Sequence, residues 1–165
     1  GDYVENALGQ GKITITPLEI AVMAAAIFND GNAPTPYTLL QMRQPNMEEW
    51  KDAASGYPPI PMMTASSAHQ LQDVMRLAVA TGAANNVTSS GLQDIGGHVA
   101  VAYSGDSTQV WFIGFAGLET GGGVAIAVVL ENNNNTSKVA EIGGDILAAA
   151  IKQLQSTNPL TKDGA

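Results

Sequence analysis

The stretch IGGHVAVAYSGDSTQVWFIGFAG, residues 95–117, decides the fold, because it contains the clearest strand–turn–strand pattern in the chain. Val99, Val101 and Tyr103 alternate with small residues, which is typical of a half-buried strand. The SGDS segment that follows predicts a tight turn. Residues 110–115 are β-branched and aromatic, and they predict a second strand antiparallel to the first.

A third strand and a helix are predicted downstream of this hairpin. Residues 124–130 form another apolar run, so we expect a three-strand antiparallel meander. After the asparagine run at 132–135, Thr136 or Ser137 can cap a last helix. Its apolar residues recur at helical spacing and should lie across one face of the sheet: Ile146, Leu147, Ala150, Ile151 and Leu154. These elements predict an α+β fold with an antiparallel sheet packed with helices.

Two further helices are predicted upstream. Thr16, Pro17 and Glu19 form a capping-box pattern that starts a helix over residues 17–29, and this helix is apolar nearly all round, so we expect protein on most of its sides. Residues 32–63 are rich in proline and predict a loop with a short strand near 38–42. Thr64 or Ser66 can cap the next helix and Gly82 can end it. Its predicted inward face consists of Leu71, Val74, Met75 and Ala78, with His69 on the surface.

Composition excludes several classes of function. The 165 residues fit one domain, and seven basic against fifteen acidic residues give a formal charge of −8, which disfavours nucleic acid and anionic membranes as partners. The chain has no cysteine and two histidines that are not at ligand spacing, so we expect neither a metal site nor a cofactor. Ser107 in GDS has no histidine downstream to act as its base, and a turn residue is the simpler interpretation. His98 follows Gly96 and Gly97, where backbone can come close to a ligand.

Several blocks of sequence resemble one known family. ALGQGKITITPLEIAVMAAAIFNDG at 7–31, VWFIGFAG at 110–117, VAIAVVLEN at 124–132 and the alanine-rich last helix resemble the C-terminal half of the transpeptidase domain of penicillin-binding proteins. The resemblance implies a partial, β-lactamase-like transpeptidase fold over residues 1–156, followed by a flexible tail at 157–165. It also implies a link to peptidoglycan synthesis in a bacterial cell wall.

Active domains of this family use three motifs: Ser-x-x-Lys, Ser-x-Asn and Lys-Thr-Gly. The resemblance places only the third in this chain, and none of its lysines has a serine three residues upstream. Laying IGGHVAVA on the family's VAGKTGTA puts His98 at the lysine, Val99 at the threonine and Ala100 at the glycine. The backbone N–H of Val101 matches the family's oxyanion-hole donor, which needs no particular side chain.

Each of the three departures weakens the motif. With a reference pKa near 6.5, histidine is only partly charged at neutral pH. Val99 removes the hydroxyl that binds the substrate carboxylate, and an unpaired buried acceptor costs about 1–3 kcal/mol. Ala100 adds a methyl group where glycine lets substrate approach the strand. We therefore identify no confirmed catalytic residue and expect the chain to be inactive alone. The same residues are also typical of an ordinary half-buried strand with no functional role.

Three hypotheses remain open. The parent protein is a pseudo-enzyme scaffold for peptidoglycan or division-complex partners, or it is an active DD-transpeptidase with its serine and lysine upstream and His98 as the cation, or the module serves only to form homo-oligomers. Because two strands of the family's sheet lie upstream, the edge at 124–130 should pair with an upstream segment or with a second copy. The resemblance implies an extracytoplasmic parent, on the periplasmic or cell-surface side, anchored in the membrane through a segment outside this chain.

Overall fold

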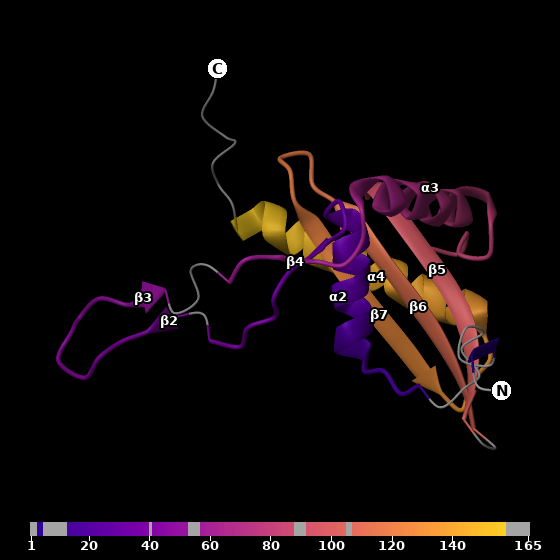
Figure 1. Ribbon diagram of the computed structural model, residues 1–165, viewed down its shortest axis with the longest axis horizontal. Coiled ribbons are helices and arrows are strands. Elements are labelled where there is room, and N and C mark those ends of the chain that lie inside the picture. The colour runs from indigo at the N-terminus through magenta and orange to yellow at the C-terminus, as the bar shows by residue number, and fades with distance from the viewer. Residues whose placement is uncertain are drawn as a thin grey trace.

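The computed structural model describes residues 3–4, 13–39, 41–52, 57–87, 92–104 and 107–157. Figure 1 shows three helices and a three-strand sheet: α2 (Pro17–Phe28), α3 (Ala65–Thr81), α4 (Thr136–Thr157), β5 (Gln93–Ser104), β6 (Ser107–Gly117) and β7 (Gly123–Glu131). The sheet is antiparallel with the order β5-β6-β7, so the predicted α+β class and the predicted meander are confirmed. The SGDS turn falls partly on residues 105–106, which lie outside the described residues, as does the tail from residue 158 onward.

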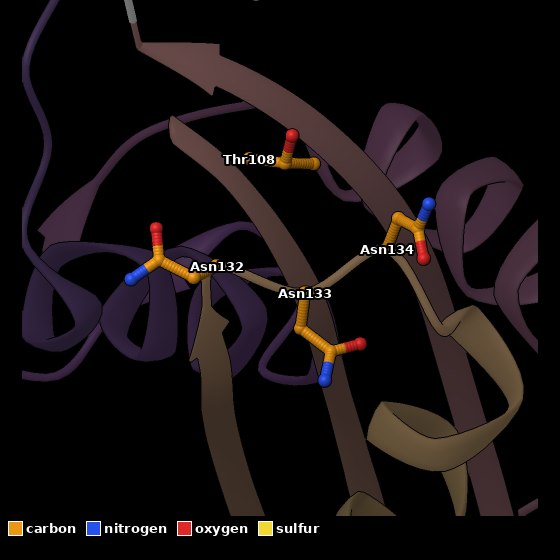
Figure 2. Close-up of a pocket in the computed structure, with 4 residues that line it drawn as sticks. All are labelled: Thr108, Asn132, Asn133 and Asn134. Atoms are coloured by element: carbon orange, nitrogen blue, oxygen red, sulfur yellow. The ribbon is translucent and has the colours of Figure 1, made fainter. Parts of the chain in front are cut away.

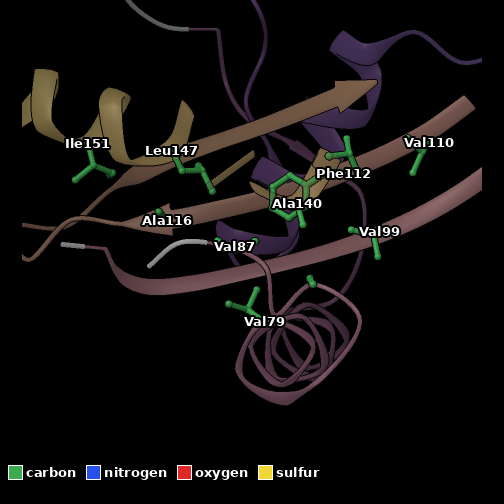
Figure 3. Close-up of a cluster of buried hydrophobic side chains, with 11 residues drawn as sticks. Val79, Val87, Val99, Val110, Phe112, Ala116, Ala140, Leu147 and Ile151 are labelled. Carbon is green, nitrogen blue, oxygen red and sulfur yellow. The ribbon is translucent and has the colours of Figure 1, made fainter. Parts of the chain in front are cut away.

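The sheet has two faces that carry different helices. One face, called the α4 face, includes Val99, Phe112 and Val128, which are neighbours across the three strands. Helix α4 covers this face, as predicted, and the main hydrophobic core lies between them (Figure 3). The opposite face, called the α2 face, includes Phe115, which packs against Ile27 of α2. Both faces of the sheet therefore contribute to hydrophobic cores.

Helix α2 begins with the predicted capping box. The Thr16 hydroxyl accepts a hydrogen bond from the Glu19 N–H at 3.2 Å, and the Glu19 carboxylate accepts one from the Thr16 N–H at 2.8 Å. The helix ends at Phe28, one residue before the predicted end. In the described part of the chain its inner side packs on the sheet and on α3, whereas Leu18 on its outer side is 61% exposed. Every residue from Ile20 to Phe28 is nevertheless buried or half-buried, so the expected burial on most sides is realised beyond the first turn.

The Glu19 carboxylate makes this cap sensitive to pH. Hydrogen bonds from the Thr16 backbone and hydroxyl lower the pKa of Glu19 below its ordinary value of 4.5. A carboxyl whose pKa is lower in the folded state stabilises the fold above the unfolded-state pKa, and this contribution is lost as pH falls through the folded-state pKa. We expect the stability difference between wild type and Glu19→Gln to shrink on going from neutral pH to about pH 3. Urea unfolding at several pH values measures this, and a difference that stays constant over that pH range would contradict the role of the ionised Glu19 carboxylate in the cap.

Helix α3 starts and stops as predicted but faces the core differently. Its cap is Thr64 and its end is Gly82. The side chains that are buried are Ala68, Gln72, Met75 and Val79, whereas Leu71 and Val74, which we predicted to face inward, are 42% and 63% exposed. The prediction is confirmed for Met75 and wrong for Leu71 and Val74, because it treated glutamine as an outward residue. The Gln72 amide donates hydrogen bonds to the carbonyl oxygens of Ile27 and Phe28 at 2.7 and 3.3 Å, and so satisfies the end of α2.

The proline-rich region forms an antiparallel ribbon that projects from the body (Figure 1). At its base, β1 (Asn32–Ala33) pairs with β4 (Ile60–Pro61). Farther out, β2 (Gln41–Met42) pairs with β3 (Lys51–Asp52). The strand predicted near 38–42 is present at residues 41–42, and residue 40 lies outside the described residues. We call the described residues 34–39, 41–52 and 57–59 of the ribbon the arm.

The N-cap of helix α4 lies one residue before the first of the two cap positions that we predicted. The Asn135 side chain accepts a hydrogen bond from the Lys138 N–H at 2.9 Å, so asparagine caps the helix and the predicted caps Thr136 and Ser137 lie within its first turn. Leu147 and Ile151 are buried in the core. None of the helices in the described part of the chain combines the length and the hydropathy of a membrane span.

Candidate active-site strand

The predicted motif residues lie in the middle of β5, which is an edge strand of the three-strand sheet. His98 and Ala100 are exposed on the α2 face, where their neighbours on β6 are Ile113 and Trp111. Val99 points to the other face and is only 8% exposed. The structure therefore brings His98 and Ala100 together on one surface and places the side chain of Val99 in the core, because successive residues of a strand point to opposite faces.

The burial of Val99 provides a second explanation for the valine at this position, which is packing in the core. Val99 belongs to the same buried cluster as Val79 and Phe112 (Figure 3). A threonine here would put its hydroxyl among apolar side chains. The core thus gives a structural reason for valine that the motif comparison could not provide.

We expect Val99→Thr to destabilise the fold by about 1–3 kcal/mol, the usual cost of burying a hydroxyl without a partner. Chemical unfolding followed by circular dichroism measures this loss. Val74→Thr, the same change at an exposed position of α3, is the matched control and should alter stability little. A Val99→Thr protein as stable as wild type would show that the hydroxyl reaches a partner or solvent, and would reopen a role for this position in the cleft.

Gly96 and Gly97 do not leave space for a ligand. A Cβ atom at Gly97 would lie 2.6 Å from the Phe112 ring on the α4 face, and one at Gly96 would overlap the Phe115 ring on the α2 face. Glycine occupies both positions because the Phe112 and Phe115 rings lie against the β5 backbone there and leave no room for a side chain. The expectation that backbone approaches a ligand at this point is therefore replaced by a packing explanation.

The surroundings of His98 are mostly apolar. Across the α2 face the row from His98 continues through Ile113 to Ala127, and the next row runs from Ala100 through Trp111 to Val129. The described lysines lie elsewhere, on the arm or on α4. Arg76 sits over the Phe115 ring at 5.8 Å, but its guanidinium is paired with Asp94 at 2.6 Å. His98 thus contributes an imidazole to a row of the sheet whose other members, Ile113 and Ala127, are apolar.

A polar pocket lies away from this strand. It has a volume of about 280 Å³ and is lined by Thr108 and by Asn132, Asn133 and Asn134 (Figure 2). The Asn133 N–H donates to the Thr108 carbonyl at 3.2 Å, which holds the turn between β7 and α4 against β6. Thr108 belongs to the α4 face, two residues before Val110, so the pocket does not join His98.

Comparison with known proteins places the chain in one family. A family model described as the penicillin binding protein transpeptidase domain matches residues 2–151. Similar solved structures include the D,D-transpeptidase domain of a peptidoglycan glycosyltransferase from Eggerthella lenta, with 24% identity and a TM-score of 0.71. They also include PBP2 of Pseudomonas aeruginosa (23%, 0.67) and a peptidoglycan glycosyltransferase from Burkholderia ambifaria (17%, 0.60).

These matches cover most of this chain but a minor part of the others. The shares of this chain are 87%, 91% and 86% for the Eggerthella, Pseudomonas and Burkholderia structures, and the shares of those chains are 33%, 32% and 41%. A search of curated proteins gave no match. The chain thus corresponds to about a third of the solved chains, which implies a larger parent domain.

Proposed function

The chain belongs to the transpeptidase domain family of penicillin-binding proteins, and we propose that it is the C-terminal part of a domain that serves peptidoglycan synthesis or cell-wall assembly as a scaffold. In this proposal the chain does not itself carry out acyl transfer. Its partners are the rest of the parent domain and peptidoglycan or division proteins. We place the parent on the extracytoplasmic side of a bacterial membrane, as the family membership suggests.

One observation carries the proposal. On β5, the exposed surface at the Lys-Thr-Gly position is made by His98 and Ala100, while Val99 is buried. This surface offers one imidazole and no ammonium or hydroxyl group for a substrate carboxylate. The sequence also contains no Ser-x-x-Lys motif that could supply the nucleophile and its base. A retained fold with a reduced binding strand is what a scaffold requires.

The exposure of His98 favours one alternative, an active parent enzyme. A protonated imidazole at this position would supply positive charge to a substrate carboxylate, as the family's lysine does. The serine and lysine would then lie in the upstream part of the parent. Because only a protonated imidazole is a cation, the alternative predicts that a lysine in place of His98 would support the same interaction.

We further propose that the upstream part of the parent domain packs against the free edge of β7. Within the described residues β7 pairs only with β6, and its residues 124–130 are half-buried. An edge strand with this much apolar surface needs a cover. The upstream part of the domain satisfies this need, and pairing with a second copy is the alternative.

Intact mass after incubation with a β-lactam tests the proposal, using the parent protein with its upstream part present. We expect no covalent adduct from parent protein that circular dichroism shows to be folded. A stable adduct would show a working acyl-enzyme site and would favour the active enzyme. In that case His98→Ala should slow adduct formation, and His98→Lys should maintain it at alkaline pH.

A further inference from the structure

The arm exposes large apolar side chains that its own chain does not cover. Six of them are between 44% and 68% exposed: Tyr37, Leu39, Met42, Met47, Trp50 and Tyr57. Near the tip, Arg43 lies over the Trp50 ring at 5.3 Å. Tryptophan, tyrosine, methionine and arginine are the residues that protein interfaces favour. The arm therefore has the composition of a contact surface.

The arm receives little support from the body. Strands β2 and β3 pair with each other and have no extensive contact with any other element of the described chain. Toward the base, the Thr35 hydroxyl donates to the Pro58 carbonyl at 3.4 Å, but an isolated two-strand ladder is only marginally stable in water. A ribbon of this length gains stability when its apolar side chains pack against another surface.

Proline determines how such a surface can bind the arm. Pro34, Pro36, Pro58 and Pro59 flank the ladder, and each lacks the N–H that strand pairing would use. The ribbon is therefore poorly suited to adding strands from a partner. Contact must come from the side chains at its tip.

The position of the arm indicates what covers it. In Figure 1 the arm extends from the body on the side of β7, away from β5. A further part of the parent domain that packs against the free edge of β7 would lie next to the arm. The solved chains that this chain resembles are about three times as long, so the parent has enough additional chain to reach both surfaces. A second copy fits less well, because two chains of charge −8 repel each other.

We propose that the arm is a docking element that holds the remainder of its own transpeptidase domain through Met42, Met47 and Trp50. This inference rests on the proposed function only in that it takes the upstream part of the parent to be folded beside β7. It does not depend on whether the parent is catalytic. The arm and the β7 edge together form one contact surface for the rest of the domain.

Thiol reactivity in the folded parent protein tests this docking. The described chain contains no cysteine, so Met42→Cys and Met47→Cys can each serve as the single thiol once other cysteines of the parent are changed to serine. We expect maleimide to react with each thiol at least about tenfold more slowly in the folded parent than in guanidinium. Val74→Cys on α3, at a position as exposed as the arm residues, is the comparison and should show less protection.

The alternatives give different results in the same experiment. Equal reactivity of folded and unfolded parent at both arm positions would overturn the proposal, provided that circular dichroism shows a folded protein. Protection that disappears on dilution would also overturn it, because a second copy would then be the occupant. The β-lactam adduct is measured independently, so its presence or absence leaves the result on the arm unaffected.

Discussion

Phe112→Ala is expected to remove about 3–5 kcal/mol of folding stability, the usual cost of deleting a buried phenylalanine ring. Phe112 is fully buried at the centre of the α4 face (Figure 3). Its ring fills a niche left by Gly97, Gly114 and Gly143: added Cβ atoms at the first two would lie 2.6 Å from ring atoms, and one at Gly143 would overlap the ring. Glycines have no side chains that could move into the vacated space, so the cavity should collapse poorly.

Urea or guanidinium unfolding, followed by circular dichroism, measures this loss. Total stabilities of small domains are about 5–15 kcal/mol, so the variant should unfold at much lower denaturant or fail to fold. Phe112→Leu keeps part of the volume and provides a measurable value in the second case. Tyr103→Ala removes an exposed ring from the neighbouring strand and should cost little. Equal losses at the two positions would contradict the central role of Phe112.

Gly143→Leu is expected to cost about 3 kcal/mol, because it inserts a side chain where α4 lies against the Phe112 ring. Two effects oppose each other at this position. Replacing a glycine inside a helix gains about 1 kcal/mol of helix propensity. The Cβ alone would overlap the Phe112 ring, however, and a fully buried ring has little room to move. The overlap should therefore exceed the gain.

The matched control is Ala149→Leu, which adds a leucine at an exposed position of the same helix. Its stability should stay close to that of wild type. The double variant Phe112→Ala with Gly143→Leu should be more stable than the sum of the two losses predicts, because the leucine can fill the vacated space. Purely additive losses in unfolding experiments would show that the two positions do not contact each other.

Local signals account for the predictions that the structure confirms. The capping box at Thr16 and Glu19 uses atoms within four residues of each other, so the sequence alone could place the start of α2. The strand pattern around Val99 and Val101 depends on alternation within one segment, and the meander follows from it. These features need no knowledge of distant parts of the chain.

Distant contacts account for the predictions that were wrong or incomplete. The inward face of α3 is set by Gln72, whose amide reaches carbonyl groups 44 and 45 residues away. Hydropathy placed Leu71 and Val74 inside, because no rule within the helix identifies those carbonyl groups. The exposure of Leu18 in the first turn of α2 is similarly decided by which parts of the fold lie next to it.

The candidate site shows the same division. The resemblance to the family predicted that His98, Val99 and Ala100 occupy the third motif and predicted what each side chain lacks there, because the flanking residues resemble those of the family. It could not determine that Val99 faces the core or that Gly96 and Gly97 accommodate Phe115 and Phe112. Those facts depend on which helix covers each face of the sheet.

The sequence by itself determined the order of α2, α3 and α4, the order of the three strands of the main sheet, and the family. It also led to the prediction that the third motif lacks its ammonium and hydroxyl groups. Only the tertiary structure decided which side of β5 is exposed, why valine and glycine occupy their positions, and that the proline-rich segment stands out as an arm. The physical reason is the range of the interactions. Caps, turns and alternation act over a few residues, whereas burial is decided by surfaces that folding brings together from distant parts of the chain.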